Sequence, residues 1–177
     1  MKRLTYIILS LVFILNTAKS QSNNNDKFIG KWITYKIIDS TDLGDIGLEC
    51  LDSFKLSVME ISKKNITSFK GYLLDTIKNE ERRYKIFENF LTPIYELFHG
   101  SWIEFCKDST LIEHTNRGAN GKPGNLLRTY EYDFFSKKLI MDKHGMSETL
   151  QVHIISNDEI ILSFISEGLT FLAKRME

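Results

Sequence analysis

The feature that most constrains this chain is a run of short apolar segments between residues 102 and 175, each ended by a few turn residues. The segments are rich in the aromatic and β-branched side chains that favour β-strands. They span residues 102–106, 110–115, 126–135, 139–142, 148–155, 159–165 and 169–175. Connections such as Lys107-Asp108-Ser109 and Ser156-Asn157-Asp158 are short and polar. Connections of this kind predict antiparallel pairing of strands that are neighbours in the sequence.

The N-terminal half adds further strand candidates. Residues 28–38 predict a long first strand, and residues 39–47, rich in glycine and aspartate, predict a loop. Apolar and polar side chains alternate over residues 54–59, and the pattern continues over 61–69 around Lys63-Lys64-Asn65, which predicts a hairpin across that polar triplet. Eight to ten strands with short connections favour an all-β antiparallel meander barrel or a strongly curled sheet.

One segment breaks the β pattern. Over residues 79–99, apolar side chains recur at steps of three and four, and charged residues crowd the N-terminal side, which predicts a single inserted amphipathic helix. Pro93 lies inside this helix, and we expect it to kink or split the helix near Thr92. His99-Gly100 supplies a stop signal. The Gly- and Asn-rich stretch at 116–125 predicts a mobile loop.

The first twenty residues predict a signal peptide. Lys2 and Arg3 precede an apolar stretch over 6–15, and Ala18-Lys19-Ser20 matches a cleavage site, so we expect residues 1–20 to be removed. The apolar stretch is too short for a stable membrane anchor, and no cysteine follows it to carry a lipid. The sequence therefore predicts an exported protein, periplasmic or extracellular, with a disordered leader at 21–27 and one domain at 28–177.

Charge and cysteine content limit the partners. Cleavage after Ser20 would leave 20 basic against 23 acidic residues, so the charge balance excludes an electrostatic footprint for nucleic acid. Cys50 and Cys106 are the two cysteines of the chain. In an oxidising compartment they would form a disulfide, while two separate buried thiols are the alternative.

Three parts of the chain resemble lipocalin-type barrels of the small exported bacterial kind. Gly30-Lys31-Trp32 is similar to the family's G-x-W, and Arg175 is similar to the basic residue that packs over that tryptophan. The stretch at 102–112 and the C-terminal residues 158–175 resemble the same relatives. The resemblance implies a barrel closed at one end by a guanidinium over an indole ring. The chain departs from the family in lacking a T-D-Y-like motif and in carrying the helix at 79–99.

The usual catalytic and metal motifs are missing from the sequence. The Gly121-Lys122 stretch fails as a phosphate loop because Asn116 stands where the first glycine is needed. The spacing of the four histidines, at 99, 114, 144 and 153, fits no zinc signature, and no G-x-S-x-G element occurs. We therefore expect no cofactor, no metal site and no enzymatic activity.

Two hypotheses about function remain open. In the first, the barrel binds a small apolar or amphipathic ligand, with the helix beside its mouth. In the second, the barrel is filled by its own side chains, and the helix face or a sheet edge binds a protein partner. The candidate cavity or partner residues are Phe87, Leu91, Ile94, Phe98, Tyr130 and Tyr132. The two tyrosines have a further alternative, which is to fill a closed core.

Overall fold

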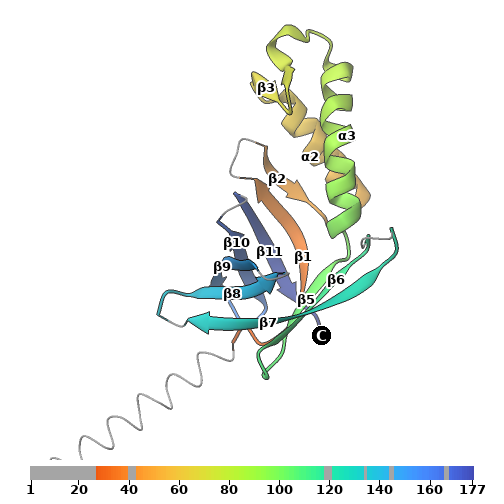
Figure 1. Ribbon diagram of the computed structural model, residues 1–177. Coiled ribbons are helices and arrows are strands. Elements are labelled where there is room, and N and C mark those ends of the chain that lie inside the picture. Colours follow the sequence, from red (N-terminus) through yellow and green to blue (C-terminus); the bar gives the residue numbers. More distant parts are fainter. Residues whose placement is uncertain (1–26, 40–42, 118–120, 134, 144–145, 166–167) are drawn as a thin grey trace, which may run out of the picture.

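The barrel and its arm are described by a computed structural model that covers residues 27–39, 43–117, 121–133, 135–143, 146–165 and 168–177 (Figure 1). The predicted signal peptide at 1–20 and all but the last residue of the predicted leader lie outside the described residues, as does His144. Figure 1 shows a β-barrel with a pair of helices projecting from one end. The helices and the small hairpin that joins them are called the arm below.

Eight antiparallel strands close the barrel. They are β1 (Gly30–Asp39), β5 (Trp102–Phe105), β6 (Thr110–Thr115), β7 (Gly124–Asp133), β8 (Lys138–Lys143), β9 (Met146–Ile154), β10 (Glu159–Phe164) and β11 (Leu169–Arg175). From β5 to β11 each strand pairs with the next, and β11 returns to pair with β1. The predicted meander of the C-terminal half is thus confirmed.

One further strand lies outside the closed barrel. The strand β2 (Gly44–Gly47) pairs with the second half of β1, from Lys36 to Asp39, while the first half of β1 pairs with β5. The prediction that 39–47 is only a loop was therefore wrong at its C-terminal end. Ile46 explains the difference, because it is 1% exposed opposite Ile37 and so contributes to the core.

Alternation along the strands positions the core. Leu139 and Leu150 face each other across β8 and β9, and both are fully buried. Ile160 and Leu162 on β10 repeat the pattern two residues apart. Because successive side chains of a strand point to opposite faces, these residues share the interior of the barrel. Burial of one such side chain stabilises the fold by about 1.5–3 kcal/mol.

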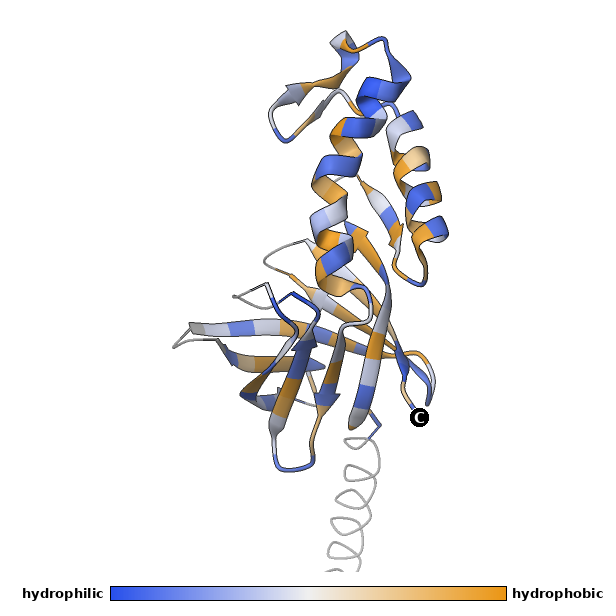
Figure 2. Ribbon diagram, turned by 90° about the vertical axis from the view of Figure 1, so that its right-hand side faces the viewer, coloured by the Kyte–Doolittle hydropathy of each residue, from blue (hydrophilic) through white to orange (hydrophobic). Residues whose placement is uncertain are grey.

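The arm is an insertion between β2 and β5. It consists of α2 (Leu51–Lys63), a hairpin of β3 (Ser68–Phe69) and β4 (Tyr72–Leu73), the 3-10 turn η1 (Leu74–Thr76) and α3 (Glu80–Phe98). Both helices carry apolar and polar stripes, seen as alternating orange and blue in Figure 2. The arm therefore contains two helices, where the sequence predicted one.

The hairpin predicted over 54–69 was wrong for most of its length, because residues 51–63 are helical. Phe54, Val58 and Ile61 are buried, and their spacing of four and three residues matches the period of a helix. Cys50 begins the helix as its N-cap, with its sulfur accepting from the backbone N–H of Ser53. The true hairpin turn lies later, at Lys70-Gly71, where φ is positive at both residues, as a two-residue hairpin requires.

The predicted helix over 79–99 is confirmed as α3. Asn79 is its N-cap and accepts from the backbone N–H of Arg82. The helix continues through Pro93, so the predicted split near Thr92 was wrong. Contacts with α2 hold this region in place, among them the Phe54 and Tyr95 rings stacked at 4.4 Å. Gly100, with φ +71°, follows the end of the helix at the predicted stop.

Candidate ligand-binding site

One end of the barrel is closed by a tryptophan and an arginine. Trp32 is fully buried, and the guanidinium carbon of Arg175 lies 4.2 Å from the centroid of its ring. Arg175 also donates to the carbonyls of Ile29 at 2.9 Å and Lys27 at 2.8 Å. The contact expected between Trp32 and Arg175 is therefore present, and the arginine ties the first strand to the last.

Gly30 is required at this closed end for two reasons. Its φ of +128° is a conformation that residues with a Cβ rarely adopt. A Cβ at this position would also overlap Nη1 of Arg175. The glycine of the G-x-W element thus makes room for the guanidinium.

Aromatic side chains pack around Trp32 at the closed end of the barrel. Tyr130 is 6% exposed, and its hydroxyl donates to the carbonyl of Cys106 at 2.8 Å. The ring of Tyr132 lies 4.5 Å from the ring of Phe28, and burial raises the pKa of its hydroxyl. Both tyrosines pack at the base of the barrel and neither lines the cavity, which agrees with the closed-core alternative.

Toward the arm the packing leaves a cavity of about 250 Å³. Its apolar walls come from Ile103, Leu162, Phe164 and Phe171 on three strands, and Leu97 and Phe98 of α3 cover it. Polar groups on its other walls are Thr34, Ser101, Glu113, His114, Thr115, Arg128 and Glu148. Trp102 completes the lining. The lining of the cavity thus combines aromatic rings with charged groups, a combination suited to an amphipathic molecule.

The lining of the cavity contains a largely buried ion pair. Nε of Arg128 lies 2.8 Å from Oε2 of Glu113, and the two side chains are only 10% and 22% exposed. Strand register explains their inward direction, because Arg128 is opposite the fully buried Leu111. Desolvation makes such a pair costly, and a pair in this position contributes little to stability compared with apolar packing. The ion pair is therefore a polar feature of the cavity lining rather than a main source of stability.

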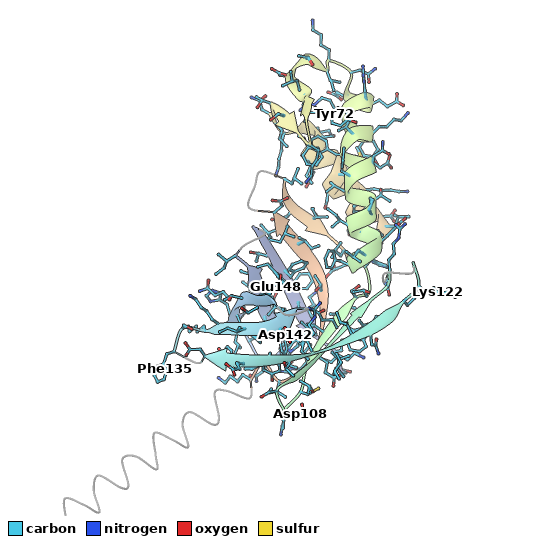
Figure 3. All side chains as sticks on the ribbon, in the orientation of Figure 1. Tyr72, Asp108, Lys122, Phe135, Asp142 and Glu148 are labelled. Carbon is cyan, nitrogen blue, oxygen red and sulfur yellow. The ribbon has the colours of Figure 1, made fainter. Side chains whose placement is uncertain are left out.

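A third ionisable side chain comes from a different part of the barrel. Glu148 on β9 is opposite Met141, which is fully buried, so the carboxylate is directed toward the interior. Figure 3 shows Glu148 near the middle of the barrel. The cavity wall therefore carries two carboxylates and one guanidinium from three strands.

Strands β7 and β8 separate beside the ion pair. They pair only from Tyr130 to Asp133, whereas the first half of β7 pairs with β6 alone. A surface hollow of about 360 Å³ lies there, lined in part by Arg128, which also lines the cavity. Leu126 and Leu127 border the hollow and are 38% and 68% exposed. Arg128 thus lines both the cavity and this surface hollow.

The predicted helix face divides between two places. Phe87 and Leu91 are fully buried, with the Phe87 ring 4.9 Å from that of Phe69, and Ile94 is partly buried against the core. Of this set, Phe98 lines the cavity, with its ring 5.0 Å from that of Phe171. These four residues do not form an exposed patch, because the first three pack in or against the core and Phe98 faces the barrel.

The two cysteines are free thiols, so the disulfide alternative is wrong for this structure. Cys106 follows Phe105, which is opposite Gly30 at the base of β1, whereas Cys50 lies just after Leu48, which bonds to Tyr35 farther along β1. Five residues of strand separate the two levels by about 17 Å. A disulfide needs Cα atoms within about 7 Å.

Perturbed titratable groups also occur outside the cavity. Tyr35 donates to Glu159 on the outer face of the barrel, and burial together with this carboxylate raises the pKa of Tyr35 to about 12. Nζ of Lys174 lies 4.2 Å above the Tyr35 ring and 2.7 Å from Glu49 in the segment before α2. This cluster joins the arm to the barrel.

The described part of the chain contains neither a metal-binding cluster nor a helix that could span a membrane. No group of three His, Cys, Asp or Glu side chains there is arranged to hold a metal ion. No helix within these ranges has the length and apolar character needed to cross a bilayer.

The charged cavity residues were missed from the sequence, although a signal for them was present. Glu113 lies two residues after Leu111, and Arg128 lies two residues before Tyr130. In strands of period two, these positions predict inward side chains. Charged residues at inward positions of a barrel would have marked the cavity wall.

No protein-family model matches the chain, and no curated protein matches its sequence. Among solved structures, a DUF4847 family protein from Bacteroides vulgatus is similar to the chain with a TM-score of 0.46 and 9% identity. The match covers 85% of this chain and 96% of that protein.

Proposed function

We propose that this protein binds a small amphipathic molecule at the arm end of its barrel. The observation that carries the proposal is the lining of the cavity, which combines the rings of Phe98, Phe164 and Phe171 with the Arg128–Glu113 pair. An apolar wall gains affinity from buried area, at about 25 cal/mol per Å² before the cost of association. The polar groups orient the ligand.

Cavity size limits the ligand. A cavity of about 150 Å³ holds benzene, and drug-sized ligands occupy about 300–1,000 Å³. A cavity of about 250 Å³ therefore suits a short chain or a single ring with one polar head. The head would lie beside Arg128 and Glu113.

We propose in addition that the chain is related to the lipocalins. The packing of Arg175 on Trp32 beside Gly30 supports this relationship, and the relationship agrees with ligand binding. Export to the periplasm or the extracellular space is part of the same proposal and is supported by the sequence pattern of residues 1–20. N-terminal sequencing of the protein recovered from its native host tests the export: a mature chain that begins at Gln21 is expected.

Binding is tested with residues 21–177, which include every helix and strand that the structure describes. Mass spectrometry of an organic extract identifies what copurifies. A thermal-shift series with hexanol, hexylamine and hexanoate then compares three heads on one tail. We expect at least one probe to raise the melting temperature, and Leu162→Phe to abolish the shift by filling the cavity.

The control for this variant is Leu139→Phe. Both leucines are buried inside the barrel, but only Leu162 lines the cavity. Overpacking costs about 1–3 kcal/mol at either site, so both variants lose stability while only Leu162→Phe loses binding. The proposal fails if nothing copurifies and no probe shifts the melting temperature, or if the two variants bind equally.

A further inference from the structure

The far end of the arm carries an excess of positive charge. This surface, called the arm tip below, comprises residues 63–85, from the end of α2 through the hairpin to the second turn of α3. It contains seven Lys and Arg against three Asp and Glu, whereas the rest of the chain contains 16 against 20. Figure 2 shows blue, hydrophilic segments gathered there, at the point farthest from the barrel. Positive charge is therefore concentrated on one protruding surface.

Most of this positive charge is not neutralised within the protein. Lys63, Lys70, Lys78 and Arg82 are exposed and have no ion-pair partner among the described residues. Lys64 and Arg83 donate to backbone carbonyls, which carry no charge. Lys85 is paired with Glu81 at 2.9 Å. An anionic partner would therefore meet several available cations.

The arm tip also exposes two large hydrophobic side chains. Leu73 and Tyr72 on β4 are 64% and 46% exposed, directly after the Lys70-Gly71 turn. Neighbouring residues hold the hairpin in place, because Leu74 is fully buried and Phe69 packs on α3 within 5.4 Å of the Phe90 ring. The exposure of Leu73 thus belongs to an ordered hairpin, and Figure 3 shows Tyr72 on the arm, away from the barrel.

We propose that the arm tip docks reversibly on a membrane surface that carries anionic lipids. In this arrangement Leu73 enters the boundary of the acyl chains, Tyr72 lies at the level of the headgroups, and the surrounding cations face lipid phosphates. Tyrosine is enriched at this interface, and basic residues near an anionic bilayer strengthen binding individually. A projecting hairpin with an exposed leucine can insert that side chain into the fluid surface of a bilayer, whereas a protein partner would need a pocket that matches it.

The experiment measures co-sedimentation of residues 21–177 with vesicles made of equal parts phosphatidylcholine and phosphatidylglycerol. Vesicles of phosphatidylcholine alone are the reference. We expect binding only to the anionic vesicles, and a decrease at high salt because screening shortens the range of the attraction. Lys70→Gln combined with Lys78→Gln should weaken binding on the order of tenfold or more. Leu73→Ser should weaken vesicle binding severalfold, because it removes the apolar side chain that enters the bilayer. The fold should tolerate this change, since Leu73 is 64% exposed.

The matched control is Lys107→Gln combined with Lys122→Gln, which makes the same charge change on exposed turns of the barrel. It should leave vesicle binding unchanged. Binding to heparin that depends on Lys70 and Lys78 but not on Leu73, without binding to vesicles, would overturn the proposal in favour of a soluble polyanion. Equal loss in the control pair, or no preference for anionic vesicles, would also overturn it.

Discussion

Replacement of Arg175 tests the closed end of the barrel most directly. Arg175→Ala removes the guanidinium from the face of buried Trp32, a contact worth about 1–2 kcal/mol. It also removes the partly buried hydrogen bond to Ile29, worth about 1.5–3 kcal/mol for a charged donor. The two exposed hydrogen bonds, to Lys27 and Asn157, add less. The expected loss is about 3–5 kcal/mol, a large share of the 5–15 kcal/mol typical of a domain.

The assay is urea denaturation, followed by tryptophan fluorescence. If the m-value is the same for all variants, such a loss lowers the urea concentration at the midpoint of unfolding by on the order of 2 M. Arg175→Lys keeps the charge but cannot reach three carbonyls, so it should retain about half of the stabilisation. Lys174→Ala is the control in the same strand: its exposed pair with Glu49 should contribute less than about 1 kcal/mol. An Arg175→Ala variant as stable as Lys174→Ala would refute the reasoning.

Gly30 provides an independent check of the same contact. Gly30→Ala should destabilise the protein through its positive φ and through overlap with the Arg175 guanidinium. Removing the guanidinium relieves the overlap but not the backbone strain. In a double-mutant cycle, Gly30→Ala should therefore cost less beside Arg175→Ala than it does alone. Strict additivity of the two losses would show that the residues do not contact each other.

Three further predictions concern other parts of the molecule. Arg128→Met should cost about 3–5 kcal/mol in thermal or urea unfolding by leaving a buried carboxylate unpaired, while Arg117→Met, at an exposed pair of similar length, should cost less than about 1 kcal/mol. Ultraviolet titration should show one tyrosine that ionises near pH 12, and this titration should be absent in Tyr35→Phe. Because the pKa of Tyr35 is raised in the folded state, the stability that Tyr35 contributes is complete below pH 10 and is lost as the pH rises toward 12. Ellman's reagent should titrate two thiols without reductant, with Cys50 reacting before Cys106 because Cys50 is exposed and hydrogen bonds from Ser53 lower its pKa; a protein without titratable thiols would contradict the structure.

The two halves of the chain differ in how far local pattern specifies their structure. From residue 102 onward, alternation and three-residue turns predict the strands well, because both signals depend on immediate neighbours. The segment 51–63 carries a double signal instead. Phe54, Leu56 and Val58 fit a strand, while Phe54, Val58 and Ile61 fit a helix. Packing of Phe54 on Tyr95 selects the helix, and that contact joins residues far apart in the sequence.

The sequence alone determined the barrel strands and the helix α3, since both rest on local periodicity. The contact between Trp32 and Arg175 was expected from the resemblance to lipocalins. Only the tertiary structure decided that α2 is a helix, that the cysteines lie apart, and that Glu113 and Arg128 meet inside a cavity. These outcomes depend on strand register and on closure of β11 against β1. Register and closure are sums over many long-range pairings, and no single stretch of the chain contains them.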